Sequence, residues 1–281
     1  MTSFNDHSRI DVVNNPNASA HQPYPYLWGG LNDPSVYQSE DNTRLVPLIR
    51  SLYSRLAAKL VEEGDRNKAL KVLDRGNELL PNDIYPYVSV MSYQYGYTQR
   101  CIFYIEDYFN VGTPEAEKHG VEMANKMLDG FVELFNWYNN ADEKTMKFHA
   151  DDITYDWIFC GSFLKSVNGK DQALNARFKD IKMDKLIDFT CKQYQDKIRN
   201  VIANNLEDQR AIGDVFQGLQ QMLNIAQLTG NANAAAKISQ FADGQINLIN
   251  QVSPQFGSYL KEFLYGTSLS DSGEEETADA A

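Results

Sequence analysis

Apolar residues recur at steps of three and four from Asn42 onward, which is the period of an amphipathic α-helix. Two such stretches flank Gly64, and Pro81 ends the second. Asp65 is a suitable N-cap for the second helix. We therefore predict an antiparallel helical hairpin over residues 42–81. Its apolar positions are Leu45, Leu48, Ile49, Leu52, Leu56, Leu60 and Val61 in the first helix, and Ala69, Leu70, Val72, Leu73 and Leu80 in the second.

The same pattern predicts further hairpins at about 86–138 and 206–251, with an interposed helical segment over 142–204. A helix is expected from about Tyr87 to Asn110, and Thr113-Pro114 provides the N-cap and first residue of the next. Strand signals are nearly lacking. We predict an all-α domain over 42–265, after an extended, proline-containing arm (1–41) and before a disordered acidic tail (266–281).

The first hairpin has the residue spacing of a tetratricopeptide repeat. The matching positions are Tyr53, Leu56, Ala57, Leu60, Gly64, Ala69, Leu73, Gly76 and Pro81. The turn glycines Gly64 and Gly112 are 48 residues apart (112 − 64), which exceeds the period of about 34 in consecutive repeats. The array is therefore expected to be irregular. Hairpins of this type form binding scaffolds, so the spacing favours a protein that binds a partner over an enzyme.

Charge and composition exclude several classes of function. The net charge of −12 and the pI of about 4.8 disfavour nucleic acid and anionic bilayers, because such partners are bound largely by Lys and Arg. No apolar run approaches the roughly 18 residues of a membrane span, and the N-terminus does not resemble a signal peptide. Cys101, Cys160 and Cys191 lack zinc or redox spacing and are expected in the core. We expect no cofactor and no metal.

No catalytic motif is present in the sequence. The densest group of titratable side chains is His149, Asp151, Asp152 and Asp156, beside Trp157. His149 and Asp152 are three residues apart and could share a helix face. One histidine with carboxylates is below the usual ligand count of a zinc site, and Asp at a helix start is ordinary capping. An enzyme or carbohydrate-binding protein that uses this cluster remains the alternative hypothesis, and it requires the groups to converge on one pocket.

Aromatic residues are concentrated from Tyr85 to Phe109. They could fill a core with rings whose hydroxyls reach solvent, or they could form a surface for peptide or sugar contact. If they form a surface, the helical spacing of Tyr93, Tyr97, Arg100 and Tyr104 marks its binding face. Trp28, in the arm, is either a further contact for a ligand or a staple laid on the first helices.

Several runs in the N-terminal third resemble one protein family. They are residues 28–37 (WGGLNDPSVY), 42–44 (NTR), 50–57 (RSLYSRLA), 63–64 (EG) and 69–75 (ALKVLDR). These runs are similar to the soluble C-terminal region of bacterial multi-pass membrane proteins related to protein O-mannosyltransferases, a family known largely as a domain of unknown function. The likeness is close over about residues 26–90.

The resemblance implies a division of labour, since glycosyl transfer in that family belongs to the membrane half. This segment would then be a non-catalytic accessory domain that holds a protein or peptide, or the membrane half of the same polypeptide. It would be a soluble domain at a membrane, on the periplasmic side. If the chain is complete as given, a cytoplasmic repeat scaffold is the expected alternative.

Overall fold

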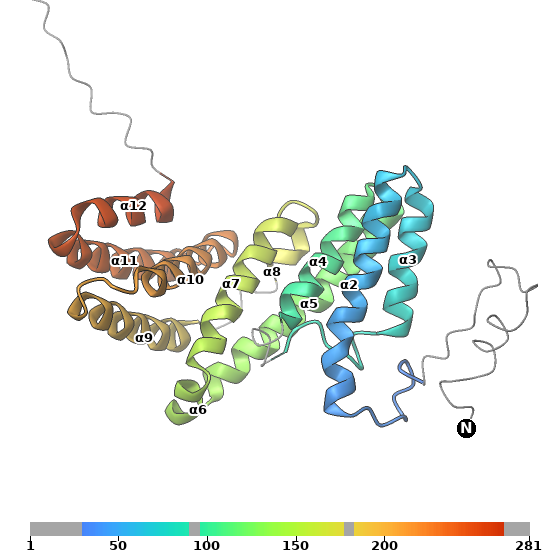
Figure 1. The fold of residues 1–281 in the computed structure, drawn as a ribbon, viewed down its shortest axis with the longest axis horizontal. Helices are drawn as coiled ribbons and strands as arrows, with labels where there is room; N and C mark the ends of the chain where they lie inside the picture. Colours follow the sequence, from blue (N-terminus) through green and yellow to red (C-terminus); the bar gives the residue numbers. More distant parts are fainter. Residues whose placement is uncertain (1–29, 90–95, 177–182, 267–281) are drawn as a thin grey trace, which may run out of the picture.

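The computed structural model describes residues 30–89, 96–176 and 183–266, and within these ranges the protein consists of α-helices and connecting turns, without strands (Figure 1). The all-α prediction is confirmed. The helices are α2 (Glu40–Glu62), α3 (Arg66–Leu79), α4 (Tyr97–Val111), α5 (Pro114–Asn140), α6 (Glu143–Phe148), α7 (Ala150–Val167), α8 (Gln172–Ala176), α9 (Asp184–Ala203), α10 (Gln209–Leu228), α11 (Ala232–Val252) and α12 (Pro254–Tyr265).

The helices form consecutive pairs along the long axis of the molecule (Figure 1). We call α2, α4, α7 and α10 the leading helices, and α3, α5, α9 and α11 the return helices. Each leading helix packs against its return helix and against the next leading helix, so that α2 contacts α4, α4 contacts α7 and α7 contacts α10. The last helix, α12, packs against α11 and α10. One hydrophobic core runs through the row, from Ala57 to Leu264.

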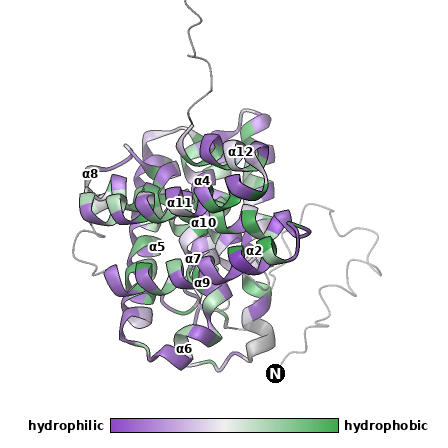
Figure 2. Ribbon diagram, turned by 90° about the vertical axis from the view of Figure 1, so that its left-hand side faces the viewer, coloured by the Kyte–Doolittle hydropathy of each residue, from purple (hydrophilic) through white to green (hydrophobic). Residues whose placement is uncertain are grey.

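The hydropathy of the helices explains this packing. In Figure 2 they alternate between hydrophilic and hydrophobic residues, as expected of amphipathic helices that share a core. No helix in the described ranges combines the length and the apolar character that a membrane span requires.

A glycine with a left-handed backbone follows each leading helix. Such a conformation is rarely adopted by residues with a side chain, so glycine allows the sharp reversal. The four residues are Gly64 (φ 84°), Gly112 (φ 69°), Gly169 (φ 84°) and Gly230 (φ 72°). The predicted N-caps of two return helices are also confirmed: the Asp65 side chain accepts a hydrogen bond from Lys68 N, and Thr113 from Ala116 N.

The second leading helix is shorter than the sequence pattern predicts. The helix expected from Tyr87 begins at Tyr97, and residues 87–89 are not helical. Pro86 precedes this stretch, the backbone N–H of Tyr87 donates to Asn82 Oδ1 (2.9 Å), and Gly96 is left-handed (φ 59°). These local features favour a non-helical backbone over a helix at residues 86–89.

The arm and the tail are described only in part. Gly30 to Ser39 form a turn and a short non-helical stretch, in which Asp33 N donates to Gly30 O (3.0 Å), and α2 then begins at Glu40, two residues before the predicted start. Leu31 and Ile49 both pack against the cluster that contains Leu79 and Leu80. Residues 1–29, with Trp28, and the tail from 267 to 281 lie outside the described residues.

Candidate functional site

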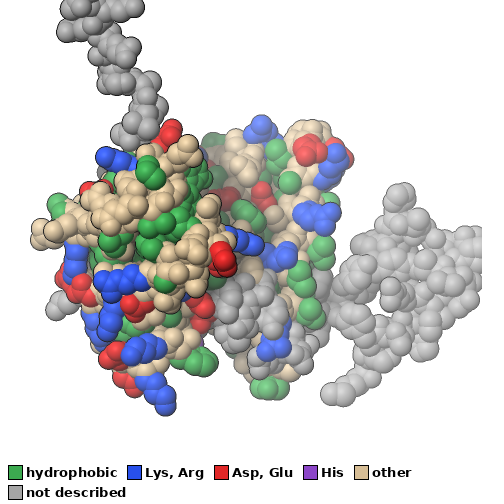
Figure 3. Space-filling model, turned by 60° about the vertical axis from the view of Figure 1, so that its left-hand side comes forward, with side chains coloured by type: hydrophobic (Ala, Val, Ile, Leu, Met, Phe, Trp, Pro, Cys, Tyr) green, Lys and Arg blue, Asp and Glu red, His purple; other side chains and the backbone are tan. Residues whose placement is uncertain are grey.

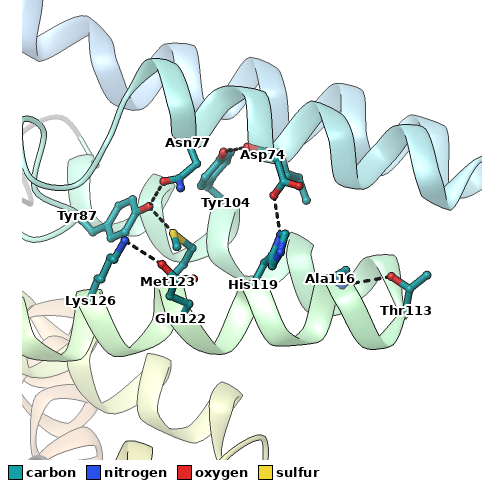
Figure 4. Close-up of polar contacts among 11 residues, drawn as sticks. Asp74, Asn77, Tyr87, Tyr104, Thr113, Ala116, His119, Glu122, Met123 and Lys126 are labelled. Atoms are coloured by element: carbon teal, nitrogen blue, oxygen red, sulfur yellow. Dashed lines mark hydrogen bonds and ion pairs between the residues drawn. The ribbon is translucent and has the colours of Figure 1, made fainter. Parts of the chain in front are cut away.

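The tyrosine-rich segment contributes mainly to the core. Tyr87 and Tyr104 are buried between the first two helix pairs. The Tyr104 hydroxyl donates to Leu73 O, and the Tyr87 hydroxyl donates to Asn77 Oδ1 (2.8 Å) and lies 3.1 Å from Met123 Sδ (Figure 4). Burial raises the pKa of both phenols. The hydroxyls therefore find internal acceptors, where the sequence interpretation expected them to reach solvent.

This packing corrects the predicted binding face. Tyr104 has 0% exposure, so it does not belong to an accessible surface. Tyr97 is half-buried beside Arg50, and burial raises the pKa of Tyr97 to about 12. Tyr93 and Trp28 lie outside the described residues. Of the predicted face, Arg100 is the residue that the structure places at the edge of a hollow.

Arg50 is a fully buried cation that the sequence interpretation did not single out. Its Nη2 donates to Leu80 O (2.9 Å) and Tyr85 O (2.7 Å), and its Nη1 lies 3.1 Å from Cys101 Sγ. The guanidinium also lies 4.5 Å from the centre of the Tyr87 ring. Arg50 therefore joins α2 to the non-helical segment and to α4, and it fixes how the first two leading helices meet.

A hollow of about 530 Å³ opens where α2 meets the first turns of α4. It is called the α2–α4 hollow, and its lining consists of Ser51, Ser54 and Arg55 from α2, with Gly96, Gln99, Arg100 and Phe103 from the start of α4. Ser51 and Arg55 are one helical turn apart, on the opposite side of α2 from Tyr53, which packs against α3. The hollow therefore faces away from the return helix.

The two arginines of the α2–α4 hollow lack a carboxylate partner within the described ranges. Arg100 Nη1 donates to Ser51 Oγ (3.3 Å), and Arg55 makes no hydrogen bond or ion pair there. Ser54, another residue of the lining, donates from Oγ to the carboxyl group of Asp107, which also accepts from Asn110 Nδ2 (3.2 Å). Burial raises the pKa of Asp107, against the effect of those bonds. Among the described residues, neither arginine of the hollow is therefore paired with a carboxylate.

A second hollow, of about 380 Å³, lies between α10 and α12. This α10–α12 hollow is lined by Gly213, Gln217 and Gln220 on one side, and by Tyr259, Leu260 and Phe263 on the other. Gln220 Nε2 donates to Phe263 O (2.7 Å), and Tyr259 stacks against Phe263 with ring centres 6.4 Å apart. Figure 3 shows apolar side chains gathered over these C-terminal helices. Exposed rings beside amide groups suit contact with a peptide.

The histidine and aspartate cluster at the start of α7 does not form one site. His149 Nδ1 lies 2.8 Å from Asp152 Oδ2, which is a contact within the helix start. Asp151 is exposed and pairs with Lys197 (2.6 Å), whereas Asp156 is fully buried and accepts from the Tyr138 hydroxyl (2.8 Å). The Trp157 ring is buried too, with Nε1 donating to Thr190 Oγ1 (3.2 Å).

These partners assign the cluster to local contacts at the start of α7, an ion pair with α9 and core packing. Among the residues that the structure describes, no three His, Cys, Asp or Glu side chains are placed to hold a metal ion together. The convergence that the alternative hypothesis requires is therefore not found at this cluster.

Comparison with known proteins finds no similar protein. No family model matches the chain, and no curated protein or solved structure is significantly similar to it. The class that the structure defines is an all-α protein of paired helices with two hollows along its leading helices. The sequence analysis named Arg100 but did not place it beside Ser51 and Arg55, because these residues come from a different helix. The α10–α12 hollow was not anticipated.

Proposed function

We propose that this chain is a non-catalytic binding scaffold of tetratricopeptide type, which holds an extended peptide or a partner protein along its leading helices. The observation that carries the proposal is the pair of hollows, one at each end of the row, where polar side chains lie beside exposed rings. Phe103 is 52% exposed and Tyr259 is 59% exposed. Large apolar rings in contact with water are typical of interaction sites.

The succession of helix pairs supports the repeat architecture. Each leading helix is followed by a left-handed glycine, and the following segment begins with a capping residue: Asp65, Thr113, Asp171 or Asn231. The intervals between the glycines, 48 (112 − 64), 57 (169 − 112) and 61 (230 − 169), are unequal. The short helices α6 and α8 occupy part of the extra length. Repeats of unequal length can still stack through neighbouring pairs.

We further propose that the scaffold is an accessory domain of a membrane protein O-glycosyltransferase and works on the extracytoplasmic side. This part of the proposal rests on the resemblance of residues 26–90 to the soluble region of that family. The scaffold would then hold an acceptor protein, or the membrane half of the same polypeptide, near the catalytic centre of the membrane enzyme.

Site-specific photo-crosslinking tests the binding surface. A photoreactive phenylalanine would replace Phe103 or Tyr259 in the full chain, within the cells that make the protein. Matched controls would carry it at Lys71 on α3 and Glu133 on α5, which are exposed positions on return helices. We expect one and the same partner from Phe103 and Tyr259, and none from the controls.

The identity of the crosslinked partner then decides the accessory role. A membrane glycosyltransferase or one of its acceptor proteins is expected. Equal crosslinking from Lys71 and Glu133, or no crosslink from either hollow, would contradict the scaffold. A reproducible partner unrelated to glycosylation would leave the scaffold in place and remove the accessory role.

A further inference from the structure

The α2–α4 hollow concentrates positive charge in a strongly acidic protein. Arg55 and Arg100 line one hollow in a chain of net charge −12, and neither is paired with a carboxylate within the described residues. Apart from the bond from Arg100 to Ser51, these guanidinium groups make no hydrogen bond to a described residue, so their other N–H groups can donate to a ligand that carries negative charge. A guanidinium group matches a carboxylate particularly well, because its N–H groups can donate two parallel hydrogen bonds.

Other groups in the hollow act in the same direction. The first turn of α4 opens here, since Gly96 and Gln99 belong to the lining, and no side chain among the described residues caps that helix. The amide groups at the start of a 15-residue helix carry partial positive charge. The side-chain amide of Gln99 adds a neutral donor beside the two arginines. An anion in the hollow would thus be met by charged and uncharged donors from two helices.

We propose that the α2–α4 hollow binds a carboxylate of an acidic peptide segment, with an apolar residue of the same segment against Phe103. This inference rests on the proposed scaffold function and names the chemistry of its ligand. The hollow, at about 530 Å³, has room for a short stretch of side chains. Phe103, half exposed at its edge, offers the apolar contact that a simple inorganic anion would not use.

The charge of the whole protein favours a lightly charged ligand. A nucleic acid or another polyphosphate would be attracted by the two arginines, but its other charges would be repelled by the acidic surface. An acidic side chain within a mixed peptide places its charge only where the arginines are. We therefore assign the hollow to carboxylates on a peptide.

Fluorescence anisotropy with two synthetic peptides tests this assignment on the full chain. One labelled probe is acetyl-Ala-Glu-Glu-Leu-Glu-Ala-amide, and the other replaces each Glu by the isosteric, neutral Gln. We expect the acidic probe to bind at least about tenfold more tightly, as one or more charge-assisted hydrogen bonds would give. Its affinity should fall as salt rises from about 0.05 M to about 0.5 M.

Substitutions assign the effect to the hollow. Arg55→Gln and Arg100→Gln should each weaken the acidic probe about tenfold and leave the neutral probe unchanged. Arg199→Gln removes the same charge from an exposed position on α9 and should change neither. Phe103→Ser should weaken both probes. Circular dichroism of each variant confirms that the helices are retained.

Several results would overturn the assignment. They are equal affinity for the two probes, an unchanged affinity in Arg55→Gln and Arg100→Gln, or no saturable binding up to about 1 mM. Full displacement of the acidic probe by about 10 mM inorganic phosphate would show that the hollow is a simple anion site, and it would exclude a peptide as the specific ligand. If Phe103 still crosslinks its partner in the Arg55→Gln, Arg100→Gln double variant, the scaffold function stands and the acidic ligand does not.

Discussion

Replacement of Arg50 by methionine tests whether one buried guanidinium holds the first two helix pairs together. Methionine keeps much of the aliphatic length and removes all of the donors. Leu80 O and Tyr85 O would each lose a hydrogen bond from Nη2, and the Tyr87 ring would lose the cation above it. Both carbonyls belong to the chain segment that leads from α3 toward α4, so its position is expected to loosen.

The magnitude follows from these contacts. A buried acceptor that loses its partner costs about 1–3 kcal/mol, and a desolvated cation–π contact contributes about 2 kcal/mol. Burial of the guanidinium itself is unfavourable, and its removal offsets part of the loss. We therefore expect Arg50→Met to lower the free energy of unfolding by about 3 kcal/mol, out of a total of about 5–15 kcal/mol.

Urea unfolding followed by far-ultraviolet circular dichroism measures this difference. With a slope of about 3 kcal/mol per molar, the midpoint should move down by about 1 M. Arg55→Met is the matched control, since Arg55 is exposed on the same helix without an internal partner in the described structure, and its effect should stay within about 0.5 kcal/mol. If both variants unfold at the same urea concentration, the inferred role of Arg50 is refuted. Arg50→Lys should recover only part of the loss, because one ammonium group does not reproduce the planar fork.

Two further substitutions test the packing and the electrostatics. At Gly161 of α7 a Cβ atom would lie 2.7 Å from the backbone oxygen of Gln221 in α10, so Gly161→Ala should lose about 1–3 kcal/mol. Gly244→Ala in α11 is the control, because a Cβ there meets open space, and it should raise the free energy of unfolding by about 0.5–1 kcal/mol. Thermal unfolding measures both variants. Equal effects would contradict the close approach of α7 and α10. Burial raises the pKa of Glu106 in the fold, against a hydrogen bond from Ser166. Because the protonated carboxyl is the form that the fold favours, this residue's contribution to stability falls as pH rises from the unfolded pKa through the raised folded pKa. Glu106→Gln should therefore raise the melting midpoint at pH 7 but not at pH 4, and an equal shift at both pH values would speak against this explanation.

The helices were predictable where local rules agree. The reversal at Gly64 and the cap at Asp65 depend on residues within one turn of each other, and both are found where the sequence places them. The prediction was wrong at Tyr87, where an apolar, aromatic pattern continues although the backbone is not helical. Pro86 and the left-handed Gly96 oppose a continuous helix, and here they outweigh the apolar periodicity.

The site was less predictable, because tyrosine suits a core and a surface equally well. Leu73 O in another helix accepts the hydroxyl of the buried Tyr104, and Asn77 Oδ1 accepts that of the buried Tyr87, which offsets the cost of burying these groups. Neither acceptor could be predicted from the residues that lie close to these tyrosines in the sequence. Arg100, named from its helical spacing, lies at the edge of a hollow, but the residues of α2 that line the same hollow were not named from the sequence.

By itself, the sequence determined the helical class, the turns after the leading helices and the acidic charge of this protein. Those properties follow from interactions within one or two helical turns, or from a sum over all residues. The tertiary structure decided which helices meet, and with them the burial of Arg50 and the pairing of Ser51 with Arg100, which are 49 residues apart. The physical reason is that periodicity fixes which side of a helix is apolar, whereas the identity of the partner depends on how side chains distant in the sequence fit together.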